Sequence, residues 1–161
     1  MRKQSRIHTV VIAGPGIMGA SFAQIFAKWY DRVYLYGVAE SSLEKADYLI
    51  SINQKSQVEQ GALTQEESRA LLERITMTTS KDCFAQADFV LEAIPEKMDV
   101  KHTFWEEVSR MVGEDVVLAT NTSGMSVTEI AQAVYRPERF AGMHWVNPPH
   151  LIPLVLSLIH I

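Results

Sequence analysis

The chain has 161 residues, one cysteine, a formal net charge of -4 and a pI near 5.7. This length predicts one domain with a substantial core and excludes a second full domain. The acidic balance, without a basic cluster beyond residues 2–6, argues against a nucleic-acid partner, and the single Cys83 excludes an internal disulfide or a cysteine-built metal site.

The first predicted element is a buried strand that ends in a glycine turn. A β-branched run over residues 8–13 leads into Gly14-x-Gly16-x-x-Gly19. The apolar positions expected on the helix that follows are Phe22, Ile25, Phe26 and Trp29. Between a strand and a helix, Gly14 suits a tight turn, Gly16 a close approach to a pyrophosphate, and Gly19 helix-to-strand packing. The stretch therefore predicts dinucleotide binding at the helix N-terminus.

The second predicted strand, residues 32–38, departs from this motif at its end. Dinucleotide-binding domains carry an Asp or Glu there, about 20 residues past the turn, to bind the ribose 2′-hydroxyl. This chain has Gly37, and the nearest following acid is Glu40. No Arg or Lys stands just after Gly37 to receive a 2′-phosphate, so this stretch offers no reason to prefer NADP.

A helical hairpin is predicted over about residues 41–74, in place of a short crossover. Residues 41–44 and 64–67 match capping boxes, and Gly61 is a helix stop between them. The residues expected to face the core are Leu43, Ala46, Ile50, Asn53, Ser68, Leu71 and Leu72.

The rest of the chain alternates strands and helices. We expect strands at residues 75–78, 87–94, 115–120 and 139–144, and helices at about residues 99–111 and after Ser126. The inward residues expected on the longer helix are Val100, Phe104, Val108 and Met111. The pattern predicts a single α/β domain over residues 1–161, built on a Rossmann-like, doubly wound and mostly parallel sheet.

Polar residues follow two successive predicted strands, where reacting groups collect in such sheets. Asn121-Thr122-Ser123 follows one strand, and His144 and Asn147 follow the next. A hydroxyl, an imidazole and an amide beside a nicotinamide suit oxidation of an alcohol to a ketone, with His144 taking the hydroxyl proton. The alternative is a satisfied strand-end histidine and a turn-forming serine. The other histidines lack convergent partners, so we predict no metal site.

These motifs resemble the NAD-binding domain of the 3-hydroxyacyl-CoA dehydrogenase family, the bacterial 3-hydroxybutyryl-CoA type included. The resemblance covers about residues 7–155. It rests on residues 14–19, 92–96, 121–123, 136–140 and 142–149. It implies NAD as cofactor and oxidation of (3S)-3-hydroxyacyl-CoA to 3-oxoacyl-CoA, in fatty acid β-oxidation or butanoate metabolism. It also implies a homodimer for the full-length family protein.

The resemblance assigns roles position by position. It implies a catalytic base at His144, a hydrogen bond from Ser123 to the substrate oxygen, and orientation of substrate and nicotinamide by Asn147. The cofactor contacts that it implies are Gly14, Gly16, Met18, Gly19, Glu96 and Lys101. The helical hairpin would help to hold coenzyme A.

Three departures from the family stand out. Gly37 replaces the acidic ribose ligand, and Leu156 replaces a glutamate that orients the catalytic imidazole. The family continues into an all-helical domain that completes the acyl-CoA cleft, whereas this chain ends at Ile161. Residues 156–161 match nothing in the family, so we expect a C-terminally truncated reading frame that binds NAD weakly and turns over little alone.

Two other functions fit the same fold. One is a related dehydrogenase of a free hydroxy acid such as gulonate or carnitine. The other is a non-catalytic dinucleotide-binding module, in the manner of crystallins built on this fold. The apolar runs at residues 10–13 and 151–161 are too short for a signal-peptide core or a membrane span, so we expect a cytoplasmic protein without a membrane partner.

Overall fold

The computed structural model describes residues 7–146 and 155–158, which form a seven-stranded sheet in the order β3-β2-β1-β4-β5-β6-β7. The strands are β1 (Thr9–Ala13), β2 (Arg32–Tyr36), β3 (Ile75–Thr78), β4 (Phe89–Glu92), β5 (Val117–Thr120), β6 (Phe140–Trp145) and β7 (Val155–Leu158). The first six run parallel, and β7 pairs antiparallel with β6. The predicted doubly wound, mostly parallel sheet is confirmed, whereas β7 was not among the predicted strands.

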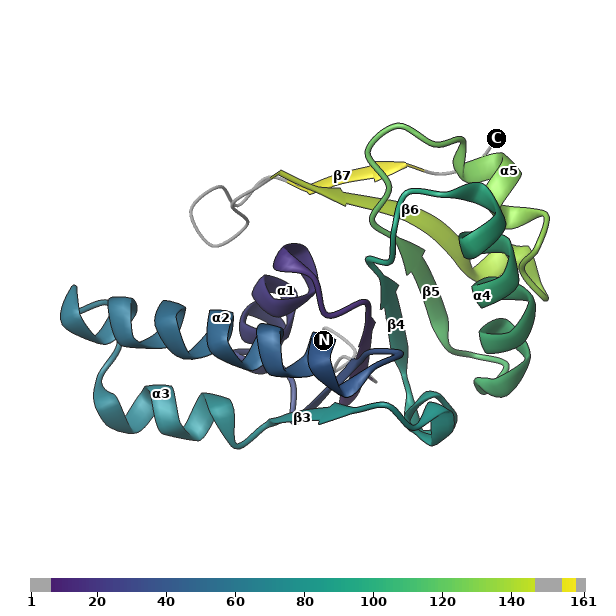
Figure 1. Ribbon diagram of the computed structural model, residues 1–161. Coiled ribbons are helices and arrows are strands. Elements are labelled where there is room, and N and C mark those ends of the chain that lie inside the picture. The colour runs from purple at the N-terminus through teal and green to yellow at the C-terminus, as the bar shows by residue number, and fades with distance from the viewer. Residues whose placement is uncertain (1–6, 147–154, 159–161) are drawn as a thin grey trace, which may run out of the picture.

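Helices cover both faces of the sheet (Figure 1). They are α1 (Ile17–Ala27), α2 (Glu40–Glu59), α3 (Gln65–Leu72), α4 (Met98–Met111) and α5 (Val127–Ala131), with short 3-10 helices η1 (Lys81–Gln86) and η2 (Pro137–Arg139). The helices α1, α2 and α3 pack on one face, and α4 and α5 pack on the other. The strand order reverses between β1 and β4, which is the point where open α/β sheets bind their ligands.

Strand alternation divides the apolar residues into two cores. Val10 and Ile12 of β1 point toward the α1 side, and Val11 and Ala13 point toward the α4 side. All four side chains are fully buried, and each buried valine or isoleucine stabilises the fold by roughly 1.5–3 kcal/mol. The β-branched run before the glycine turn is therefore continuous because both faces of its strand are covered.

The helix α1 ends earlier than its apolar spacing predicts. Phe22 and Phe26 are buried and contact the ring of Trp145 at centroid distances of 5.6 and 6.2 Å. Trp29 lies past the end of α1 and is 80% exposed, so its predicted place on the buried face is wrong. The chain leaves the helix after Ala27, and the indole then no longer lies over the sheet.

The predicted hairpin is confirmed as α2 and α3, although its two helix starts differ. At α3, Thr64 Oγ1 accepts from Glu67 N at 3.1 Å, and Glu67 Oε2 accepts from Thr64 N at 2.8 Å, which completes the predicted capping box. Gly61, with φ of +71°, follows α2 as predicted. The capping box predicted for α2 is wrong: this helix follows Ala39, whose methyl group accepts no hydrogen bond, and Ser42 Oγ donates back to Ala39 O.

The predicted buried stripe of the hairpin is confirmed at Leu43, Ala46, Ile50, Ser68 and Leu71, and it differs at two positions. Gln54 of α2 is buried where Asn53 was expected, because its amide donates to Gln24 Oε1 and accepts from Ser68 Oγ, both at 2.8 Å. Leu72 is 39% exposed, which also differs from the prediction. A buried polar network thus joins α1, α2 and α3 in addition to the apolar core that they share.

The predicted inward face of α4 is confirmed at Val108, which is buried, and at Phe104 and Met111, which pack against the same core. The buried residues of α4 are Lys101, Trp105, Val108 and Ser109. Val100, predicted to point inward, is exposed. The prediction is wrong at this one position: the neighbouring Lys101 is buried instead, because it finds an acceptor inside the protein, the carboxylate of Glu92. Within the described ranges, no helix combines the length and the apolar character needed to cross a membrane.

Candidate active site

The glycine turn has the geometry of a phosphate-binding loop. Gly14 has φ of +107°, and a Cβ there would lie 2.5 Å from the carbonyl oxygen of Ala93. A Cβ on Gly19 would lie 1.8 Å from the Gly14 carbonyl oxygen, so α1 approaches β1 too closely for any side chain. A Cβ on Gly16 would meet nothing within 4 Å. Two glycines are therefore required by packing, and the third leaves bare backbone facing open space.

The first turn of α1 offers hydrogen-bond donors beside that open space. Gly16 precedes the helix and supplies no side-chain cap, and the N–H groups of a first helical turn have no acceptor within the helix. Met18 contributes its backbone to this turn, while its side chain packs against the apolar core on the α1 side. Bare backbone, free donors and the positive end of a helix dipole together suit a pyrophosphate.

A cavity of about 470 Å³ opens next to the turn, on the α4 side of the sheet. It is lined by the turn itself, by the ends of β2 and β4, and by α4. Its walls are mostly apolar, and its charged residues are Lys81, Asp99 and Glu107. The hydrogen bond from Lys81 Nζ to Glu107 raises the pKa of that lysine. A largely apolar cavity at the switch point of the sheet suits the adenosine end of a dinucleotide.

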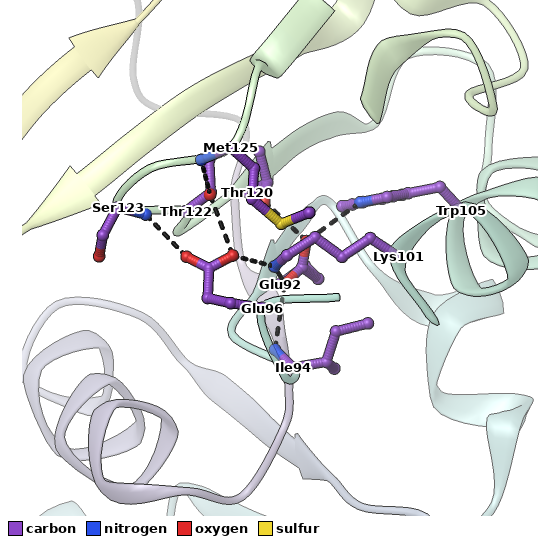
Figure 2. Close-up of polar contacts among 9 residues, drawn as sticks. All are labelled: Glu92, Ile94, Glu96, Lys101, Trp105, Thr120, Thr122, Ser123 and Met125. Atoms are coloured by element: carbon purple, nitrogen blue, oxygen red, sulfur yellow. Dashed lines mark hydrogen bonds and ion pairs between the residues drawn. The ribbon is translucent and has the colours of Figure 1, made fainter. Parts of the chain in front are cut away.

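A buried carboxylate, that of Glu92, lies at the carboxyl end of β4 and is surrounded by polar partners (Figure 2). Glu92, the last residue of β4, is 0% exposed and has four hydrogen-bond donors around it. Its Oε1 accepts from Lys101 Nζ at 2.5 Å and from Ile94 N at 3.0 Å. Its Oε2 accepts from Thr120 Oγ1 at 2.6 Å and from Trp105 Nε1 at 3.2 Å. Both oxygens are thus satisfied, as a buried charge requires.

Lys101 carries this network to the loop after β5. Its ammonium lies between two carboxylates, because Nζ is also 3.4 Å from Glu96 Oε2 (Figure 2). Glu96 accepts in turn from Thr122 Oγ1 at 3.0 Å and from Ser123 N at 2.7 Å. The structure therefore brings together three predicted site residues, Glu96, Lys101 and Ser123. Sequence reasoning did not identify Glu92 as part of the site, although an acid that closes an apolar strand is a detectable signal.

His144 lies on β6 with one ring nitrogen unsatisfied. Its Nδ1 is buried and has no hydrogen-bond partner among the described residues. The residue directly opposite on β7 is Leu156, and opposed residues of an antiparallel pair share one face. A leucine offers no acceptor to the imidazole. Met143 and Trp145 pack toward the α1 core, so His144 between them points to the α4 side, where the cavity lies.

The strand register places His144 and Ser123 at the same edge of the sheet. Thr120 of β5 pairs with Gly142 of β6, so both residues lie just past the paired ends of neighbouring parallel strands. Asn121 fixes this arrangement, since its Oδ1 accepts from Trp145 N at 3.0 Å. Sequence reasoning did not assign Asn121 that role. Asn147 lies outside the described residues, and within those residues no cluster of three His, Cys, Asp or Glu could hold a metal.

The chain is similar to known proteins over almost its whole length. Residues 9–156 match the family described as "3-hydroxyacyl-CoA dehydrogenase, NAD binding domain". The 3-hydroxyadipyl-CoA dehydrogenase of Escherichia coli K12 is 35% identical over 92% of this chain and 31% of its own length. The 5-formyl-3-hydroxy-2-methylpyridine 4-carboxylate 5-dehydrogenase of Mesorhizobium japonicum is 31% identical over 92% of this chain and 48% of its own length.

Solved structures agree with these sequence matches. The (S)-3-hydroxybutyryl-CoA dehydrogenase of Ralstonia eutropha superposes with a TM-score of 0.90 at 32% identity, over 94% of this chain and 53% of that one. The 3-hydroxybutyryl-CoA dehydrogenase of Escherichia coli K12 gives 0.90 at 34% identity, over 94% and 32%. The chain thus spans about half or less of the length of these relatives. It belongs to the family of NAD-binding domains of 3-hydroxyacyl-CoA dehydrogenases.

Proposed function

We propose that this chain supplies the cofactor site and the catalytic residues for NAD-dependent oxidation of (3S)-3-hydroxyacyl-CoA to 3-oxoacyl-CoA. The observation that supports it most is that the glycine turn, Ser123 and His144 follow strand positions that the register aligns, so that all three lie at the same carboxyl edge of the sheet. Bound NAD would take a hydride from C3 of the substrate.

Different residues of the chain would bind different parts of the dinucleotide. The backbone from Gly14 to Gly19 would hold the pyrophosphate, and the cavity on the α4 side would hold adenosine. Glu96 and Lys101 would lie at the nicotinamide end, since they join the loop that carries Ser123. This division follows the usual direction of a dinucleotide across the carboxyl edge of a doubly wound sheet.

His144 would act as the general base. Its imidazole would accept the proton of the 3-hydroxyl, while the Ser123 hydroxyl donates a hydrogen bond to that oxygen. The resulting imidazolium needs an acceptor at Nδ1, and Leu156 across the strand pair provides none. We therefore expect this chain, with Leu156 opposite His144, to have a low turnover.

The proposal extends to assembly and to the rest of the acyl-CoA cleft. The relatives are two to five times longer than the matched part, so we propose that sequence beyond this domain completes the cleft and forms a homodimer. The α2–α3 hairpin would contribute to coenzyme A binding. A cytoplasmic location is likewise a proposal.

A second substrate class has a specific observation in its favour. One relative at 31% identity is named for a pyridine carboxylate rather than for a coenzyme A thioester. A free hydroxy or formyl acid is therefore the alternative substrate, on the same fold and with the same His144 and Ser123.

A chimera separates these substrates. Residues 7–155 replace the matching domain of the Ralstonia eutropha enzyme, which then supplies the residue after Val155 and its own second domain. We expect the chimera to oxidise NADH with acetoacetyl-CoA and to ignore free 3-oxo acids. The variant His144→Gln should lose about 10²- to 10⁴-fold in kcat. Activity confined to free acids, or a His144→Gln chimera that remains active, would contradict the proposal.

A further inference from the structure

The end of β2 is built around a contact between Pro15 and Gly37. A Cβ on Gly37 would lie 2.7 Å from Cγ of Pro15, 3.0 Å from Oγ of Ser42 and 3.1 Å from Cδ2 of Leu43. The proline belongs to the glycine turn, and its ring fills the space in which a side chain at position 37 would begin. The acid that usually binds the ribose 2′-hydroxyl is therefore sterically excluded as well as missing.

Among the residues that the structure describes, no other carboxylate takes the place of that acid. Glu40, the next acid along the chain, accepts from Thr79 Oγ1 at 3.1 Å and does not line the cavity. Asp99 and Glu107 line it from α4, and Glu107 is already paired with Lys81 at 2.5 Å. The part of the cavity at the end of β2 thus presents a bare glycine backbone.

Among the described residues that line the cavity, Lys81 is the cation. Gly37 N donates to Thr78 O at 3.1 Å, which ties the end of β2 to the strand that leads into η1, where Lys81 is the first residue. Its side chain is about half exposed and lines the cavity. The ammonium can therefore leave Glu107 for a stronger anion without breaking a buried contact.

We propose that the adenosine end of this cleft accepts a 2′-phosphate about as well as a 2′-hydroxyl, so that the domain binds NADP(H) as well as NAD(H), with Lys81 facing the phosphate. The inference rests on the proposed function of the cleft as a dinucleotide site. An acid at the end of β2 favours NAD over NADP for two reasons: it accepts a hydrogen bond from the 2′-hydroxyl of NAD, and it repels the 2′-phosphate of NADP. Gly37 does neither, and Lys81 attracts the phosphate.

Titration of the chain with NADH and with NADPH, followed by nucleotide fluorescence at low ionic strength, tests the inference. We expect the two Kd values to agree within about fivefold. A larger preference for NADH would overturn this inference alone. Binding of neither nucleotide would overturn the proposed function together with it.

Lys81→Gln tests the assigned cation. We expect it to weaken NADPH binding about three- to tenfold and to leave the Kd of NADH within about twofold, because only the phosphate loses a partner. If the variant binds both nucleotides equally more weakly, or binds both as the wild type does, the role of Lys81 is contradicted. Because this side chain is about half exposed, the variant should fold as the wild type does, and its thermal midpoint checks this.

The double variant Pro15→Ala/Gly37→Asp restores the missing acid and removes the closest of the three contacts that a side chain there would meet. We expect it to shift the NADH-to-NADPH preference toward NADH by about ten- to a hundredfold. Pro15→Ala alone is the matched control and should leave the ratio of the two Kd values unchanged. A double variant that folds and keeps the wild-type ratio would overturn the steric account.

Discussion

At the residue scale, the ion pair of Glu92 and Lys101 is the most demanding contact of the site. Both side chains are 0% exposed, and two charges taken out of water are tolerated only when every hydrogen bond is made. Here Trp105, Thr120 and the backbone of Ile94 complete the shell of Glu92. The pair therefore positions Lys101, and through Glu96 it holds the backbone of Ser123.

Removing the charge of Glu92 should have effects on both stability and local order. We expect Glu92→Gln to lower the free energy of unfolding by about 3–5 kcal/mol, because the ammonium of Lys101 loses its buried partner. Urea denaturation measures this loss, and amide hydrogen exchange at Ser123 should become faster. Glu106→Gln, on the exposed face of α4, is the control and should stay within about 0.5 kcal/mol. Equal stability of the two variants would contradict the account.

His144 offers a second residue-scale test. We expect Leu156→Glu to place a carboxylate beside the unsatisfied Nδ1, since the two residues are directly opposed. In an NMR titration, the midpoint of the His144 ring resonances should then move up by about 0.5–1 pH unit, because the carboxylate favours the imidazolium. Ser157→Glu is matched to it but opposes Met143, on the other face. Equal shifts in both variants would refute the proposed geometry.

Some candidate site residues could be proposed from sequence because they lie in segments that resemble those of a known family. Glu96, Lys101 and Ser123 lie in recognisable segments after strand ends, and the structure joins them. Glu92 and Asn121 were not identified, because their partners lie up to 28 residues away and only the packed sheet brings them together. Buried polar satisfaction is a tertiary property, which apolar spacing does not record.

At the scale of the element, the α2–α3 hairpin depends on a correct helix start. Thr64→Ala should lower the free energy of unfolding by about 1 kcal/mol, since it removes the side-chain half of the capping box at α3. Ser41→Ala is the control, because the capping box predicted there is not formed. Thermal or urea unfolding compares the two variants. A larger loss for Ser41→Ala than for Thr64→Ala would contradict the observed helix starts.

The burial of residues in η1 and α4 depends on tertiary contacts more than on local sequence spacing. The 3-10 helix η1 buries Cys83 almost fully, and burial raises the pKa of its thiol to about 11. The helix α4 buries Lys101 in place of Val100 because the lysine ammonium pairs with the carboxylate of Glu92 in β4. The presence of a helix can be predicted from its capping residues and from the glycines that end it. The face that the helix buries depends on the side chains of the sheet against which it packs.

At the scale of the whole molecule, alternation of strands and helices predicts a doubly wound, mostly parallel sheet, and the structure adds its strand order. Continuous apolar strands such as β1 require cover on both faces, and the helices between them supply it. The antiparallel β7 could not be predicted, because its pairing with β6 is set by the sheet edge rather than by its own sequence. That pairing sets Leu156 opposite His144.

The central claim is that the open backbone at Gly16 receives the dinucleotide pyrophosphate. Gly16→Val is the most direct test, since a Cβ there meets nothing within 4 Å and the fold should be unaffected. Fluorescence titration with NADH should show at least about tenfold weaker binding at an unchanged thermal midpoint. Gly113→Val, where a Cβ makes only an ordinary contact with Val116, should bind as the wild type does. Undiminished NADH binding by a folded Gly16→Val variant would contradict the account.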